Sequence, residues 1–91
     1  MKIRELIDTA AAKSQQTQIE IAEELGIKPA RLSEWKSGQR KPDANEIAFF
    51  AEKADLAVLA TVAEIEAELN PRYAAIWKNA VSQISKIRVN P

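Results

Sequence analysis

Two short helical segments joined at a single glycine restrict the fold of this chain more than any other feature. Thr17 and Glu20 have the Thr-x-x-Glu spacing of a capping box, which predicts the start of a helix. Gly26 can adopt the left-handed conformation that ends this helix, and Pro29 suits the first turn of the next one. We therefore expect two helices that meet at a sharp turn and bury the wedge between them.

The residues around this turn are spaced as such a wedge requires. Ala22 provides the small side chain that two closely approaching helices need. Trp35 follows Leu32 by one helical turn, so we expect it in the core rather than stacked on a base. The remaining apolar residues of the wedge are Ile21, Leu25 and Ile27. Residues 17–37 are thus predicted to form one compact unit of two helices.

Hydrophobic periodicity predicts helices in the rest of the chain too, and no segment has the alternating pattern of a strand. The expected helices cover residues 3–12, 44–55, 56–69 and 71–88. A second capping box, Asp43-x-x-Glu46, begins the first helix after the turn unit, and Asn70 is expected to cap the last helix. The residues expected on the buried face before Asn70 are Val58, Leu59, Val62, Ile65 and Leu69. The fold class is therefore all-α.

The formal net charge of the 91 residues is zero, but the charges are unevenly distributed. Residues 26–42 carry five basic side chains and one acidic one, whereas residues 43–69 carry one basic and seven acidic side chains. Residues 70–91 carry four basic side chains and no acidic one. Because a phosphate backbone responds to local charge, the basic segment 26–42 is a candidate surface for nucleic acid.

The chain contains no cysteine and no histidine, so disulfides, thiolate sites and the commonest general bases and zinc ligands are absent. No catalytic group accompanies the helical carboxylates, and we expect neither an enzyme nor a cofactor or metal. The longest uncharged stretch, residues 56–63, is far shorter than the ~20 residues that span a bilayer. No signal peptide is visible. We expect one cytoplasmic domain without membrane contact.

The motif resembles the Cro and lambda-repressor class of helix-turn-helix proteins. The resemblance is carried by Gln18-x-x-Ile21-Ala22-x-x-Leu25-Gly26-Ile27 and by Leu32-Ser33-x-Trp35-x-x-Gly38-x-Arg40-x-Pro42. It covers about residues 3–56. We expect residues 1–56 to form a DNA-binding domain and residues 57–91 to form a C-terminal helical extension that packs on this domain or on a partner. The acidic helix of this extension and residues 70–73 have a looser similarity to small regulatory proteins of filamentous prophages.

This resemblance implies a lambda-repressor-like bundle in which helix 29–37 enters the DNA major groove. Affinity is expected to come mainly from the phosphate backbone. The candidate backbone contacts are Gln18, Lys28, Lys36, Ser37, Gln39, Arg40 and Lys41.

The residues that would face the bases depart from the usual pattern of the family. Pro29 and Ala30 offer no hydrogen bond at the start of the recognition helix, although alanine can pack on a thymine methyl group. Glu34 stands where arginine or lysine is frequent, and it can accept a hydrogen bond from cytosine N4. Arg31 is the long donor near the helix start, and Ser33 completes the candidate set.

Two functions follow from these observations. The first is a transcriptional regulator of phage or mobile-element type, which binds double-stranded DNA as a homodimer. The second is a protein-interaction module, similar to an antirepressor or antitoxin, that keeps the fold without recognising DNA. The basic segment 28–41 and the Gly38-x-Arg40-x-Pro42 pattern favour the first. Pro29, Ala30, Glu34 and the zero net charge favour the second. The apolar residues Tyr73, Trp77 and Ile84 either pack on their own domain or form the dimer contact.

Overall fold

The structure is a computed structural model that describes the backbone of residues 1–89 and the side chains of residues 1–84. The helices are α1 (Ile3–Ser14), α2 (Gln18–Leu25), α3 (Pro29–Ser37), α4 (Ala44–Lys53), α5 (Val58–Leu69) and α6 (Ala74–Val89), with a 3₁₀ turn, η1 (Pro71–Tyr73), before α6. The described residues contain no strand. The predicted all-α class is confirmed, and the helices lie within a few residues of their predicted positions.

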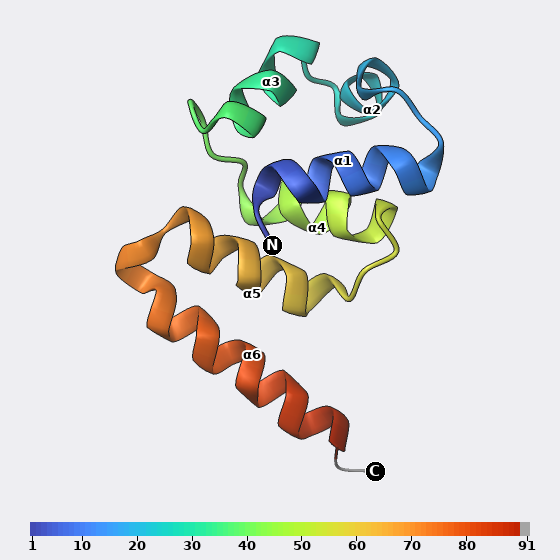
Figure 1. The fold of residues 1–91 in the computed structure, drawn as a ribbon. Coiled ribbons are helices and arrows are strands. Elements are labelled where there is room, and N and C mark those ends of the chain that lie inside the picture. Colours follow the sequence, from blue (N-terminus) through green and yellow to red (C-terminus); the bar gives the residue numbers. More distant parts are fainter. Residues whose placement is uncertain (90–91) are drawn as a thin grey trace.

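The helices form a bundle with a projecting hairpin at one end. As Figure 1 shows, α2 and α3 lie on one side of α1 and α4, and α5 lies on the opposite side. The last helix, α6, turns back at η1 and packs along α5. The molecule measures 40 × 30 × 18 Å along its principal axes. The α2–turn–α3 unit and the hairpin therefore lie at opposite ends of the bundle.

The core is formed by side chains from the first five helices. The largest fully buried side chains are Leu6, Ile7, Ile21, Leu32, Trp35, Ile47, Phe50 and Ile65. Trp35 packs edge-on against Phe50, with ring centroids 5.9 Å apart. Ala22 is fully buried, while Leu25 and Ile27 pack against the core from its margin. The predicted wedge around the turn is confirmed, as is the placement of Trp35 in the core.

Two of the three predicted helix caps are present. The Thr17 hydroxyl accepts a hydrogen bond from the Glu20 amide at 3.1 Å, and the Glu20 carboxylate accepts one from the Thr17 amide at 2.9 Å. Asp43 and Glu46 make the same reciprocal pair at 2.8 Å each. At Asn70 the predicted boundary is confirmed but the predicted side-chain cap is absent. Asn70 ends α5 and is also the N-cap residue of η1, where its carbonyl accepts the Tyr73 amide at 2.9 Å. Its side-chain amide instead donates to the Glu66 carbonyl at 3.3 Å.

The buried face of α5 also differs from the prediction at one residue. Leu59 is 71% exposed, whereas Thr61, Ala63 and Ile65 are buried. The prediction placed a single apolar face of α5 against the core, but α5 packs against α4 on one side and against α6 on another. The small residues Thr61 and Ala63 are therefore buried as well as Ile65. Within the described part of the chain, no helix is long and apolar enough to cross a membrane.

Candidate nucleic-acid interface

The turn between α2 and α3 is built by one glycine. Gly26 has φ +71°, in the left-handed region that favours glycine. The Gly26 amide donates to the Glu23 carbonyl and the Ile27 amide donates to the Ala22 carbonyl, and these hydrogen bonds end α2. Lys28 then precedes Pro29, whose fixed φ begins α3. Because Leu32 and Trp35 hold the inner face of α3 in the core, its other faces remain available to a ligand.

The predicted site residues fall into an exposed set and a half-buried set. The exposed residues are Lys28, Pro29, Ala30, Ser33, Ser37, Gln39, Arg40 and Lys41. The half-buried residues are Gln18, Arg31, Glu34 and Lys36. Gly38, at φ +84°, ends α3 and directs the chain into the segment 39–41, which we call the exit loop. Pro42 is buried and anchors the end of this loop.

Glu34 lies between two arginines of the site. Its Oε1 atom is 4.0 Å from Nε of Arg31, one turn earlier on α3, and 3.6 Å from Nε of Arg40 in the exit loop. The backbone amides of Gln39 and Arg40 also donate to the Glu34 carbonyl, at 2.9 and 3.3 Å. The side chain and the backbone of Glu34 thus fold the exit loop back against α3.

Asp8 is a member of this surface that sequence reasoning missed. Its Oδ1 atom accepts an ion-pair contact from Lys36 Nζ at 2.7 Å and a hydrogen bond from Gln18 Nε2 at 3.5 Å. The carboxylate therefore joins α1 to the end of α3 and to the start of α2. Asp8 lies on an exposed position of an ordinary amphipathic helix, so no local sequence signal distinguishes it.

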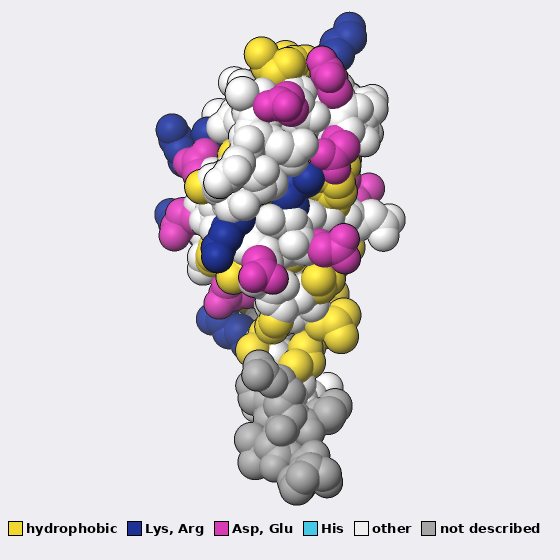
Figure 2. Space-filling view, turned by 90° about the vertical axis from the view of Figure 1, so that its right-hand side faces the viewer, with side chains coloured by type: hydrophobic (Ala, Val, Ile, Leu, Met, Phe, Trp, Pro, Cys, Tyr) yellow, Lys and Arg dark blue, Asp and Glu magenta, His cyan; other side chains and the backbone are white. Residues whose placement is uncertain are grey.

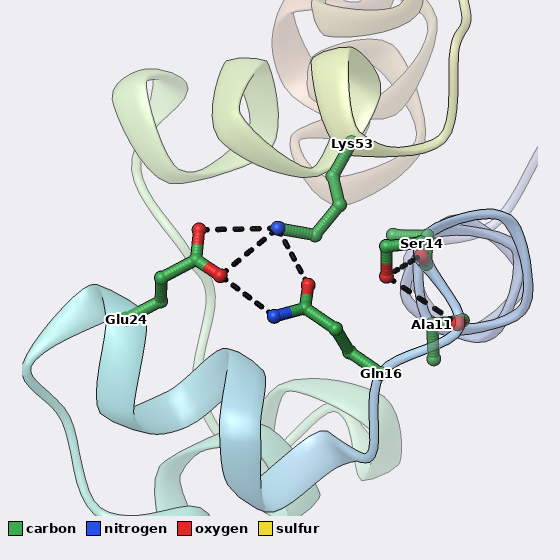
Figure 3. Close-up of polar contacts among 6 residues, drawn as sticks. Ala11, Ser14, Gln16, Glu24 and Lys53 are labelled. Atoms are coloured by element: carbon green, nitrogen blue, oxygen red, sulfur yellow. Dashed lines mark hydrogen bonds and ion pairs between the residues drawn. The ribbon is translucent and has the colours of Figure 1, made fainter.

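A second polar cluster fixes α2 against α4. Figure 3 shows Lys53 reaching from α4 to Gln16 and Glu24, with Nζ 2.6 Å from Gln16 Oε1 and 3.1 Å from Glu24 Oε2. Gln16 Nε2 donates to Glu24 Oε1 at 2.9 Å. The hydrogen bond from Gln16, and then that from Lys53, lower the pKa of Glu24 from its ordinary value of 4.5. This cluster holds α2 in position from the side away from the exit loop.

Three of the five exposed large hydrophobic side chains in the described part of the chain lie on the hairpin of α5, η1 and α6. Leu59, Tyr73 and Ile76 are 71%, 50% and 64% exposed. On the face shown in Figure 2, acidic and basic side chains intermingle over most of the body, and hydrophobic side chains gather at the end where the hairpin lies. One groove of about 380 Å³ is lined by Glu66, Asn70, Tyr73, Ile76 and Trp77. We call it the hairpin groove.

The hairpin groove and the exit loop are connected. Lys41 Nζ lies 3.5 Å from Oδ1 of Asn70, which also lines the groove. The predicted dimer residues Tyr73 and Trp77 both line this groove, while Ile84 is half-buried further along α6. A ligand in the groove would therefore lie next to one end of the basic surface.

Comparison with known proteins gives one match. Residues 13–57 match the model of a helix-turn-helix family, a span that contains α2, the turn, α3, the exit loop and α4. No curated protein and no solved structure matches the chain.

Proposed function

Because residues 13–57 belong to the helix-turn-helix family of Cro and lambda-repressor type, we propose that this protein is a sequence-specific transcriptional regulator with α3 as its recognition helix. The family is one of DNA-binding regulators and not of enzymes, in agreement with the expectation from the sequence. The resemblance of the motif favours a regulator of phage or mobile-element type. Residues 1–56 form the DNA-binding part in this proposal, and residues 57–91 the extension that determines assembly.

The observation that supports this function most strongly is the exposure of the basic residues at both ends of α3. Lys28 precedes α3, and Arg40 and Lys41 follow it, and all three side chains are exposed. They flank a helix whose inner face is fixed in the core by Leu32 and Trp35. A rigid helix with cations at both ends can enter the major groove while these cations contact the phosphates on either side.

We further propose that the protein binds DNA as a homodimer through the hairpin groove. The exposed side chains of Tyr73, in η1, and Ile76, in α6, line the same groove as Trp77, so a second copy of α6 in this groove would bury them. Dimerisation also compensates for weak contacts by one subunit, because Pro29 and Ala30 provide no hydrogen bond to a base. Two linked subunits gain affinity by binding two half-sites together.

One specific observation favours the alternative of a protein-interaction module. Glu34 lies on the recognition helix and pairs with two of the arginines that would otherwise contact DNA. In this alternative the protein keeps the fold, binds a protein partner and has no measurable affinity for duplex DNA. The two functions differ in their response to salt.

The test is a salt titration of binding to duplex DNA. A regulator loses affinity steeply with salt, with a slope of about −0.9 per phosphate contacted. The double variant Arg40→Ala/Lys41→Ala should remain folded, bind more weakly and reduce this slope by about 2 per subunit. The double variant Arg4→Ala/Lys13→Ala removes the same charge from exposed positions of α1 and should retain most of the slope. Absence of binding at low salt would support the interaction module instead.

A further inference from the structure

The two arginines beside Glu34 offset the electrostatic repulsion between its carboxylate and the phosphates of DNA. A carboxylate on a recognition helix is repelled by phosphates when it is alone. Here Arg31 and Arg40 lie 4.0 and 3.6 Å from Oε1, so the cluster of three side chains carries a net charge of +1. The whole cluster is therefore attracted to DNA, and Glu34 can approach the groove without a net electrostatic cost.

The same contacts leave the carboxylate free to accept hydrogen bonds. Both distances from Arg31 and Arg40 to Oε1 exceed those of a hydrogen bond, so the arginines neutralise Glu34 without occupying its acceptor sites. The Glu34 side chain is 34% exposed, which leaves it accessible from outside the bundle. Of the exposed residues before it on α3, Pro29 and Ala30 have no side-chain group that could hydrogen-bond to a base, and Ser33 has only a short hydroxyl.

We propose that this cluster recognises a C·G base pair within each half-site. Glu34 accepts a hydrogen bond from N4 of the cytosine, which is the exocyclic donor that a carboxylate recognises in the major groove. Arg31, one turn closer to the start of α3, donates to O6 and N7 of a guanine in the same or the adjacent pair. Arg40 lies beyond the end of α3 with its side chain 56% exposed; it neutralises Glu34 and contacts the backbone. This inference rests on the proposed function and specifies the DNA that it selects.

The test is selection of duplexes from a randomised pool at low salt by the wild type and by Glu34→Gln. The wild type should enrich a C·G pair at a fixed position of each half-site. Glutamine has nearly the shape of glutamate but pairs with adenine, so Glu34→Gln should enrich A·T at that position and leave the others unchanged. With purified duplexes, replacing C·G by A·T there should weaken wild-type binding about 5- to 150-fold and strengthen binding of the variant.

Two control variants separate base recognition from charge. Glu52→Gln removes one negative charge from an exposed position of α4 and should enrich the same sequences as the wild type. Lys28→Ala should weaken binding to all duplexes to a similar extent and leave the selected sequence unchanged. A third variant, Arg31→Ala, tests the proposed guanine contact and should relax the selection of guanine at that position.

The outcomes distinguish this inference from the proposed function. If no duplex is enriched by the wild type even at low salt, the proposed function fails and the base assignment fails with it. If the wild type enriches a defined sequence but Glu34→Gln enriches the same one, the protein binds DNA and the inference is overturned. Enrichment of A·T by the wild type at the position that responds to Glu34 would also overturn it.

Discussion

Lys36 of α3 and Asp8 of α1 form the shortest ion pair among the described residues, with Nζ and Oδ1 2.7 Å apart. The Lys36 side chain is only 18% exposed, so its aliphatic part is covered and its charge is already paired. Asp8 also accepts a hydrogen bond from Gln18. A residue of α1 thereby fixes both the end of α3 and the start of α2.

Replacing Lys36 should affect stability more than the electrostatics of DNA binding. Lys36→Ala removes the pair with Asp8 and the packing of the lysine stem, so we expect the free energy of unfolding to fall by about 1 kcal/mol. The salt slope of duplex binding should stay near that of the wild type. Urea denaturation and a salt titration measure the two quantities.

Lys41→Ala is the matched control for Lys36→Ala. Lys41 is exposed, and its contact with Asn70 is a long surface hydrogen bond of 3.5 Å. Its removal should leave the urea midpoint unchanged and lower the salt slope by about 1. If Lys36→Ala lowers the slope as much as Lys41→Ala does, then Lys36 leaves Asp8 and contacts a phosphate in the complex.

Two left-handed residues should respond to substitution in opposite directions. A Cβ atom added at Gly26 meets no atom within 4 Å, so Gly26→Ala is opposed by backbone strain alone and should cost about 1 kcal/mol. Gly26→Asn should cost less, because asparagine tolerates this region. Gln15 ends α1 at φ +57°, and Gln15→Gly should stabilise the protein by about 0.5 to 1 kcal/mol. Thermal unfolding of the three variants tests these signs, and a stabilising Gly26→Ala would contradict the assigned backbone conformation.

The Gln16–Glu24–Lys53 cluster should make stability depend on pH in the acidic range. The folded-state pKa of Glu24 lies below its ordinary value of 4.5, so folding favours the ionised carboxylate. Its contribution is complete above pH 4.5 and is lost as the pH falls through the lower folded-state pKa. As the pH is lowered through this range, the unfolding midpoint of Glu24→Gln should fall less steeply than that of the wild type.

Lys53→Met provides the control for this pH dependence. Lys53 is a direct hydrogen-bond donor to Glu24, so its removal should reduce the same acid-range effect. The double variant Glu24→Gln/Lys53→Met should then resemble the single Glu24→Gln variant in its pH profile. Parallel profiles for wild type and Glu24→Gln would show that the cluster does not contribute in solution.

A charge introduced into the hairpin groove should separate dimerisation from folding. Ile76 is 64% exposed, so Ile76→Asp should leave the thermal midpoint of the monomer nearly unchanged. It should weaken self-association in sedimentation experiments and reduce affinity for two half-sites more than for one. Ser82→Asp adds the same charge at an exposed position further along α6 and should retain the dimer. A wild type that remains monomeric at high concentration would contradict the dimer.

The local elements could be predicted from the sequence because their signals are local. The capping boxes at Thr17 and Asp43 and the turn at Gly26 each depend on residues within a few positions of one another. The buried position of Trp35 followed from its spacing along one helix. Such local features determine where each helix begins, where it ends and which of its faces is buried.

The pairing of polar groups between helices could not be predicted in the same way. Asp8 meets Lys36 only because α1 crosses the end of α3, and Gln16 meets Lys53 only because the end of α4 lies beside the connection between α1 and α2. Periodicity places Leu59 on the buried face because it identifies an apolar face but not which neighbours cover it. The sequence shows that Glu34 is an unusual residue at its position, but its contact with Arg40 depends on the path of the exit loop.

The described core contains no side chain from α6. Substitutions along the outer surface of this helix consequently have little effect on whether the rest of the chain folds. If the protein acts as proposed, substitutions on this outer surface would therefore alter self-association without altering α3 or the DNA sequence that it selects.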